Sequence, residues 1–263
     1  TLAVALDGKL YGPSSVKNPY GIMTTEMPED IILQIVEAYA TAAAMAQYGG
    51  HDMVQIHGAH GWLLSQFMSP LYNHRTDRYG GSLENRARFP LMIVEAIRKR
   101  CPTLPIEYRF SANDHMEGGF RPEEAVEFAK MLDGKVDLIH ITSSSFWDPS
   151  CGLLFPSMFA PRGCNLSLAA QIKKPVKTPV VTVGRISDLH QADQAIANGD
   201  VDMVAAGRAF LADPEWVSKV YHGHEEDVAP CLRCGTCIPG AYGPAKDVPF
   251  HAHIRRCSVN PEI

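Results

Sequence analysis

The sequence predicts an α/β fold made of consecutive strand–helix units. Short apolar runs of strand length alternate five times with longer segments of helical periodicity. The runs are apolar enough to be buried, as the strands of parallel sheets are. Polar or positively charged residues follow the ends of several of these runs. Such alternation is typical of a parallel sheet flanked by helices.

The predicted helices have recognisable ends. In the first of them, Pro28 suits the opening position, and Glu29 and Asp30 favour the positive end of the helix dipole. Gly49 and Gly50 end this helix. The helices are predicted over residues 28–48, 84–100, 122–133, 165–174, 188–198 and 214–221.

The predicted strands number five, which fits either an open doubly wound sheet or part of a (β/α)8 TIM barrel. An eight-stranded barrel would need about three further strands. In both architectures the ligand lies at the carboxyl ends of the strands. The strands are predicted over residues 53–56, 106–110, 136–142, 179–183 and 201–205.

Composition excludes several classes of protein. The 263 residues carry a formal net charge of -5, with 46% hydrophobic and 20% charged residues, which is ordinary for a globular protein. No basic patch predicts nucleic-acid binding, and no apolar run approaches the ~20 residues that span a membrane. Residues 1–21 lack the layout of a signal peptide. Seven cysteines, four of them among the last 33 residues, indicate metal chemistry and a cytoplasmic location.

Two histidines follow the first predicted strand of the sheet, in the segment His57-Gly58-Ala59-His60-Gly61-Trp62. Two imidazoles three residues apart on a turn can converge on one carbonyl oxygen and stabilise an enolate. A pair of structural histidines is the alternative. A zinc site is a weaker alternative, because the H-E-x-x-H pattern and a third ligand are absent.

Two Gly-Arg dipeptides, Gly184-Arg185 and Gly207-Arg208, follow two successive predicted strands. Glycine lets the backbone approach a phosphate, and arginine can bind it through two hydrogen bonds. Phosphate sites after the last two strands recur in TIM barrels. Taken alone, such short dipeptides are weak evidence and favour an ordinary structural role.

A cysteine motif occupies the end of the chain. Cys231, Cys234 and Cys237 are spaced by two residues each, and Cys257 follows after nineteen more, before Ser-Val-Asn-Pro. Thiolates at this spacing suit a four-iron cluster, with zinc as the competing metal. The composition changes near residues 221–228, which predicts a boundary between a region 1–222 and a cysteine-rich region 223–263.

Two longer segments carry a family resemblance. Residues 66–70 (QFMSP) and 73–86 (NHRTDRYGGSLENR) resemble the old yellow enzyme superfamily, and the resemblance continues to residue 263. The branch concerned is that of the iron–sulfur flavoproteins, which includes 2,4-dienoyl-CoA reductase, 2-enoate reductase and trimethylamine dehydrogenase.

This resemblance implies an FMN-binding TIM barrel with a [4Fe-4S] cluster, which uses electrons from NAD(P)H to reduce the activated C=C bond of a small unsaturated carbonyl compound. An enoyl-CoA, an enoate and a steroid or bile-acid enone all fit. It places His57 and His60 at the substrate carbonyl oxygen and Arg109 at the isoalloxazine ring. It assigns the FMN phosphate to Gly184, Arg185, Gly207 and Arg208, and the cluster to Cys231, Cys234, Cys237 and Cys257.

The pattern departs from the family at the proton donor. Trp62 stands where the family usually has a tyrosine that donates the proton, and an indole N–H is no acid near neutral pH. Asp148 stands where dienoyl-CoA reductases have a histidine. Asp148, a tyrosine elsewhere or solvent could donate the proton, with Trp62 shaping the pocket. Amine oxidation of the trimethylamine dehydrogenase kind and a catalytically impaired homologue are the alternative functions.

The resemblance also implies that further segments belong to the protein. The family has earlier barrel strands before the point that matches Thr1, and dinucleotide-binding domains commonly follow the point that matches Ile263. No G-x-G-x-x-G fingerprint occurs in the sequence, so an FAD or nicotinamide site is expected in another domain. A homo-oligomer is a further possibility.

Overall fold

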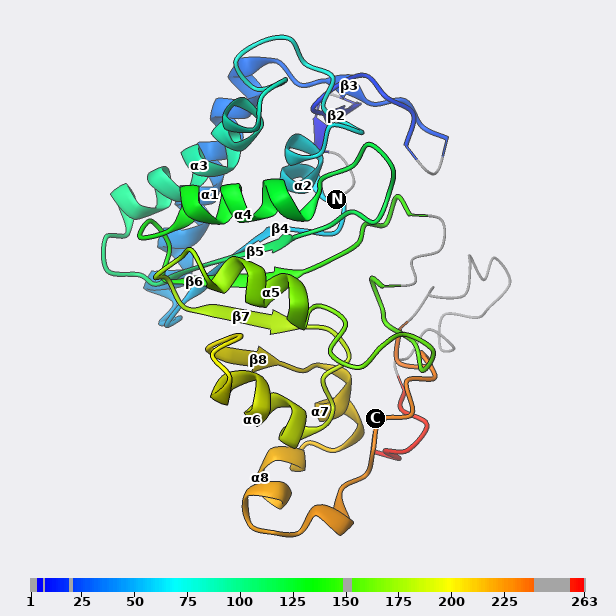
Figure 1. Ribbon diagram of the computed structural model, residues 1–263. Coiled ribbons are helices and arrows are strands. Elements are labelled where there is room, and N and C mark those ends of the chain that lie inside the picture. The colour runs from blue at the N-terminus through cyan, green and yellow to red at the C-terminus, as the bar shows by residue number, and fades with distance from the viewer. Residues whose placement is uncertain (1–3, 7, 19–20, 149–152, 239–255, 263) are drawn as a thin grey trace.

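The main sheet of the protein is parallel, as the sequence predicted. The computed structural model describes residues 4–6, 8–18, 21–148, 153–238 and 256–262 (Figure 1). Five neighbouring strands pair in sequence order, all parallel. They are β4 (Val54–Gly58), β5 (Ile106–Ser111), β6 (Leu138–Thr142), β7 (Val180–Val183) and β8 (Met203–Ala205).

Helices follow the strands and cover one side of this sheet (Figure 1). Within the described residues, β4 and β8 form the two edges and do not pair with each other, so these five strands close no barrel. The α/β class is therefore confirmed. The helices that the sequence predicted are α1 (Glu29–Tyr48), α3 (Leu83–Arg100), α4 (Pro122–Leu132), α5 (Leu166–Lys173), α6 (Leu189–Ala197) and α8 (Trp216–Tyr221).

Several short elements escaped prediction because they are too short to show periodicity. Strands β1 (Val4–Leu6), β2 (Lys9–Gly12) and β3 (Thr25–Glu26) form a separate small sheet. Helix α2 (Leu63–Met68) follows β4, and its six side chains are all buried. Helix α7 (Arg208–Ala212) and the 3-10 turn η1 (Glu225–Asp227) follow β8. Helix α7 begins directly after Gly207, so Arg208 lies at a helix start.

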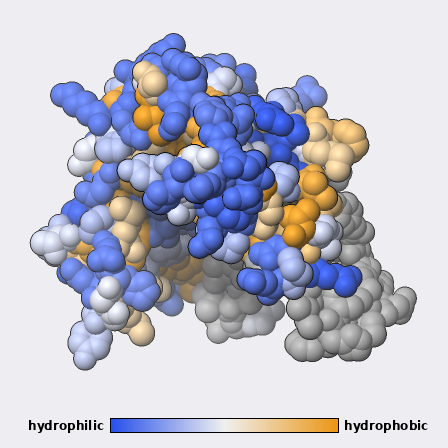
Figure 2. Space-filling model, turned by 90° about the horizontal axis from the view of Figure 1, so that it is seen from below, coloured by the Kyte–Doolittle hydropathy of each residue, from blue (hydrophilic) through white to orange (hydrophobic). Residues whose placement is uncertain are grey.

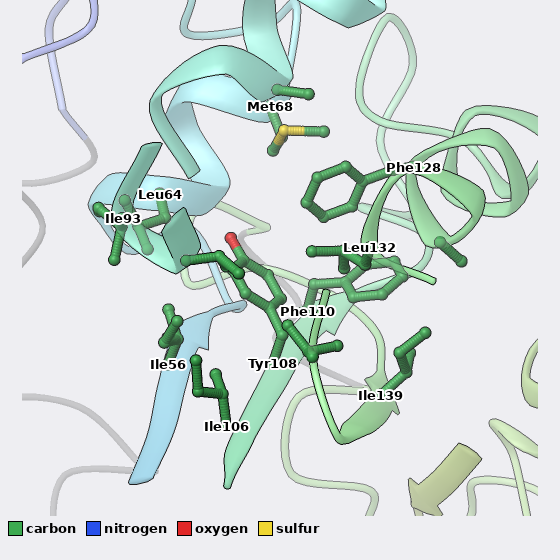
Figure 3. Close-up of a cluster of buried hydrophobic side chains, with 14 of the residues drawn as sticks. Ile56, Leu64, Met68, Ile93, Ile106, Tyr108, Phe110, Phe128, Leu132 and Ile139 are labelled. Atoms are coloured by element: carbon green, nitrogen blue, oxygen red, sulfur yellow. The ribbon is translucent and has the colours of Figure 1, made fainter. Parts of the chain in front are cut away.

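The strands of the main sheet have two unlike faces. Tyr108 and Phe110 of β5 point toward the helices, where both pack edge-on against Phe128 of α4 (Figure 3). The alternate residues Arg109 of β5 and His140 of β6 lie on the opposite face, with His57 of β4 opposite Arg109. Because side chains alternate along a strand, the apolar core lies between the sheet and its helices. The polar groups lie on the other face of the sheet, which we call the inner face.

The motif of residues 73–86 supports the fold rather than the cavity. The Asn73 side chain donates to the carbonyls of Phe67 and Tyr79, both at 2.7 Å. The buried guanidinium of Arg75 donates to the carbonyls of Pro13 at 3.0 Å and Met27 at 2.7 Å. These bonds tie the N-terminal sheet to the loop before α3.

None of the described helices combines the length and apolar character needed to cross a bilayer. One face of the molecule is mostly hydrophilic, with small separate hydrophobic patches (Figure 2). No disulfide joins the cysteines in the described part of the chain.

Candidate active site

One cavity of about 440 Å³ lies at the carboxyl ends of the strands. Its walls come from both halves of the sheet, which brings together two groups of residues that the sequence had singled out separately. His57, His60, Trp62 and Arg109 line it from β4 and β5, and Gly184, Arg185, Gly207 and Arg208 line it from the segments after β7 and β8.

The two histidines lie edge to face, with ring centroids 5.2 Å apart. The Nε2 atom of His60 lies 3.1 Å from Thr142 Oγ1, and the His60 backbone N–H donates to Ser111 Oγ at 2.9 Å. His57 Nδ1 is buried and has no hydrogen-bond partner. Burial, and then the charge of Arg109, lowers the pKa of His57 to about 4 and that of His60 to about 2. Both rings are therefore neutral at pH 7. A neutral imidazole N–H can still donate a hydrogen bond to a substrate oxygen.

Arg109 offers a buried cation beside these rings. Its Nε atom is buried without a hydrogen-bond partner. Burial lowers the pKa of Arg109, and the charge of Glu107 opposes that effect. An orphaned guanidinium N–H at the cavity suits an anionic or strongly polar ring edge, such as that of a reduced flavin.

A carboxylate and a histidine on the inner face escaped the sequence interpretation. Glu107 Oε1 lies 2.6 Å from Nδ1 of His140, and both side chains are buried. Burial alone would raise the pKa of Glu107, but hydrogen bonds from His140 and Gln55 lower it below its ordinary value. The alternation of polar and apolar residues in β5 and β6 was the signal that could have found this pair.

We expect Glu107→Gln to destabilise the fold by about 1 kcal/mol at pH 7, since a charge-assisted hydrogen bond is lost. The carboxyl pKa is depressed in the folded state, so its contribution is present above the unfolded value of 4.5 and is lost as the pH falls through the folded value. Urea unfolding of wild type and variant at pH 7 and below pH 4.5 measures this difference. An equal difference at both pH values would contradict the charge-based explanation.

The segment after β7 forms a cradle of backbone. Gly184 has φ 155°, and a Cβ there would lie 2.7 Å from Asn165 Nδ2 and 3.0 Å from Cys164 Sγ. Arg185 follows with φ 53°, and its Nε atom is buried without a partner. A Cβ on Gly207 would meet only open space. Bare backbone beside orphaned guanidinium atoms fits a phosphate group.

Aromatic side chains form the apolar wall of the cavity. Trp62 packs edge-on against Phe146 at 5.3 Å between centroids, and Phe146 packs against Phe155 at 5.8 Å. The sequence interpretation missed both phenylalanines, since they lie in the loop after β6 that has no periodicity. Trp62 thus lies in the apolar wall of the cavity.

Asp148 does not line this cavity. Its backbone N–H donates to the Ser145 carbonyl, and its charge acts on Tyr72 and His115. Among the described residues that line the cavity there is no carboxyl and no phenol. The position therefore gives no support to Asp148 as the proton donor.

The four cysteines of the C-terminal motif line one smaller cavity beside the first. Cys231, Cys234, Cys237 and Cys257 all contribute to it, and Cys231 lines the larger cavity as well. Hydrogen bonds from Ser258 and then Thr236 lower the pKa of Cys234 to about 7. Figure 1 shows residues 231–238 in orange and 256–262 in red, on the side toward which the strand arrows point.

The thiol spacing bears on the choice of metal. Among the described residues, the one group that gathers three ligand atoms within 4.8 Å of one another is His224, Glu226 and Asp227, without any cysteine. A single zinc ion about 2.3 Å from each sulfur would hold the sulfurs about 3.8 Å apart. No three of the four motif sulfurs lie within 4.8 Å of one another in the structure.

Comparison with known proteins identifies the class. Residues 7–227 match the NADH:flavin oxidoreductase / NADH oxidase family, so the chain belongs to this family of the old yellow enzyme superfamily. It is 40% identical over 244 residues to NADH oxidase of Thermoanaerobacter brockii, which covers 92% of this chain and 36% of the relative. It is 34% identical over 266 residues to cinnamate reductase of Clostridium sporogenes, with 95% and 39% covered. The chain thus spans little more than a third of these relatives.

Solved structures agree with this assignment. The complex of 2-naphthoyl-CoA reductase with 2-naphthoyl-CoA superposes with a TM-score of 0.87 and 32% identity, which covers 98% of this chain and 38% of that one. Histamine dehydrogenase from Rhizobium sp. 4-9 gives a TM-score of 0.83 at 28% identity, with 97% and 36% covered.

Proposed function

We propose that the protein is an FMN- and [4Fe-4S]-dependent reductase of the activated C=C bond of an α,β-unsaturated carbonyl compound, with NAD(P)H as the electron source. One observation carries the proposal: a single cavity joins a neutral histidine pair, a buried arginine and a Gly-Arg phosphate cradle. Two of the similar proteins are named as reductases of cinnamate and of 2-naphthoyl-CoA, which supports an unsaturated acid or its CoA ester as the substrate class.

Each group of cavity residues has a separate proposed role, set by its position. His57 and His60 hold the substrate carbonyl oxygen and stabilise the enolate by hydrogen bonding. Arg109 would contact the ring of FMN, and its fixed charge would favour the reduced form of the flavin. Gly184, Arg185, Gly207 and Arg208 hold the flavin phosphate. FMN, when bound, supplies the hydride for the β-carbon.

The proton for the α-carbon comes from solvent in this proposal. The cavity offers neither a carboxyl nor a phenol among its described lining residues, and the Trp62 indole is no acid near pH 7. Trp62 instead forms the apolar wall with Phe146. Protonation of an enolate needs only a weak acid. The larger contribution to catalysis in this proposal therefore comes from the two histidines, which lower the energy of the enolate.

The cysteine segment completes the proposal. Cys231, Cys234, Cys237 and Cys257 would hold a [4Fe-4S] cluster, which would supply single-electron transfer. The division at residue 222 separates an FMN region, equivalent to later strands of an eight-stranded barrel, from the cluster segment 223–263. NAD(P)H, and FAD if present, bind to another domain of the protein, which works in the cytoplasm, where thiolates stay reduced.

Amine oxidation is the second candidate function, favoured by the likeness to histamine dehydrogenase. The charges of the cavity oppose it. Arg109, Arg185, Arg208 and Arg233 line the cavity, whereas no carboxylate does so among its described residues. A cationic amine would find no negative counter-charge there. A neutral or anionic carbonyl compound needs none.

The test uses the full-length protein purified without oxygen. We expect the reduced flavin to be reoxidised rapidly by cinnamate, cinnamoyl-CoA or an aryl enone in stopped flow, and the oxidised flavin to stay unreduced by histamine or trimethylamine. Bleaching by an amine without reoxidation by any unsaturated carbonyl would replace this proposal with amine oxidation. Flavin and iron analysis of the same sample tests the cofactors independently.

A further inference from the structure

Arg233 lies between Cys231 and Cys234 and adopts an unusual backbone conformation. Its φ is 56°, in the left-handed region that glycine adopts far more easily than arginine. A non-glycine residue stays in this region only where surrounding contacts hold it there, and such positions cluster at ligand sites. The conformation therefore points to a task for the arginine side chain itself.

The position of Arg233 is central to the chemistry of the protein. It lines the large cavity, the small cavity of the four cysteines and a third cavity of about 270 Å³ between α6 and α8. Arg185 and Arg208 line the large cavity together with Arg233, and Arg162 lines the third cavity. Three arginine side chains therefore meet at the large cavity.

Carboxylates do not balance this positive charge within the described part of the chain. Among the described residues, no carboxylate forms an ion pair with Arg185, Arg208 or Arg233, and the nearest pair is Arg162 with Asp188 at 3.6 Å. Like charges repel more strongly in a partly buried site than in water. A phosphate monoester dianion would offset this positive charge and can accept hydrogen bonds from several guanidinium groups at once.

We propose that Arg233 is a third arginine of the flavin-phosphate cradle, so that the cysteine segment itself holds the FMN phosphate. The inference rests on the proposed function and adds a physical link between its two cofactors. FMN binding then favours the conformation of the cysteine segment that holds the cluster, and cluster loading favours FMN binding, because linkage is reciprocal.

The substitution Arg233→Gly gives a sharp test. Glycine is at ease at φ 56°, so this variant removes the guanidinium without straining the backbone. Arg256→Gly is the matched control, since Arg256 also adjoins a cysteine of the motif but is exposed and lines none of the three cavities. Flavin fluorescence measures the dissociation constants of FMN and of riboflavin, which lacks the phosphate, on deflavinated full-length protein.

We expect Arg233→Gly to weaken FMN binding about tenfold and to leave riboflavin binding unchanged, with Arg256→Gly close to wild type. Wild-type preference for FMN over riboflavin that persists in Arg233→Gly would overturn the inference and leave the proposed function standing. Equal wild-type affinity for FMN and riboflavin would instead count against FMN itself as the cofactor.

The link between the cofactors has its own readout. Added FMN is expected to slow the removal of iron by a chelator several-fold in wild type and in Arg256→Gly. Riboflavin is expected to slow it less, and FMN to lose this effect in Arg233→Gly. The same FMN protection in Arg233→Gly as in wild type would show that the cysteine segment does not contact the phosphate.

Discussion

Gly184→Ala is expected to release the flavin and to destabilise the fold. The new Cβ would lie 2.7 Å from Asn165 Nδ2 and 3.0 Å from Cys164 Sγ, and the φ of 155° is rarely adopted by L residues. Asn165 also donates to the Val183 carbonyl at 2.6 Å, so it has little freedom to move away. Overpacking of this kind costs about 1–3 kcal/mol of stability. Displacement of the cradle would weaken FMN binding roughly 100-fold, equivalent to about two charge-assisted hydrogen bonds.

Gly207→Ala is the informative control for this prediction. A Cβ at Gly207 meets nothing within 4 Å, so the free protein should keep its stability. The methyl group would protrude where we place the phosphate, and FMN affinity should fall. Thermal unfolding of the flavin-free variants and FMN titration separate the two effects. Full FMN affinity in Gly207→Ala would place the phosphate elsewhere.

His57→Phe is expected to lower kcat/KM for an unsaturated carbonyl compound by roughly 100-fold, the typical effect of removing one hydrogen-bond donor from an oxyanion site. Phenylalanine keeps the ring volume and removes both nitrogens. Flavin content should stay unchanged, since the proposed phosphate residues lie on the other side of the cavity. His51→Phe, at an exposed histidine, is the control. Unchanged turnover in His57→Phe would remove His57 from the mechanism.

The pH dependence follows from the same histidine. Its folded pKa of about 4 lies below the ordinary value of 6.5, so the neutral ring is the folded form. The associated stability is complete above pH 6.5 and is lost as the pH falls toward the folded pKa. Substrate binding should therefore show no histidine titration between about pH 5 and about pH 8. A change in binding centred near pH 6.5 would show that His57 titrates as an ordinary imidazole.

The sequence by itself determined the α/β class and the five parallel strands, because buried strands and amphipathic helices differ in period and in end signals. Helix 122–133, for example, was predicted within one residue of its observed end at Leu132. The sequence could also single out Gly184, Arg185 and the cysteines. Glycine lets the backbone approach a phosphate, arginine can bind that phosphate through two hydrogen bonds, and cysteine binds metals. It could not find β1 to β3, α2 or α7, whose few residues fold through tertiary contacts.

The tertiary structure alone decided which of these residues meet. Residues 57 and 208 are far apart in sequence, and only the parallel sheet brings them to one cavity, since every strand ends on the same side. The same geometry keeps Asp148 out of the cavity wall, pairs Glu107 with His140 across two strands and places Arg233 beside Arg185 and Arg208. Side-chain periodicity determines which face a residue occupies. The residues that it contacts depend on strand register and loop packing. These bring together segments that are far apart in the sequence, so no local sequence pattern predicts them.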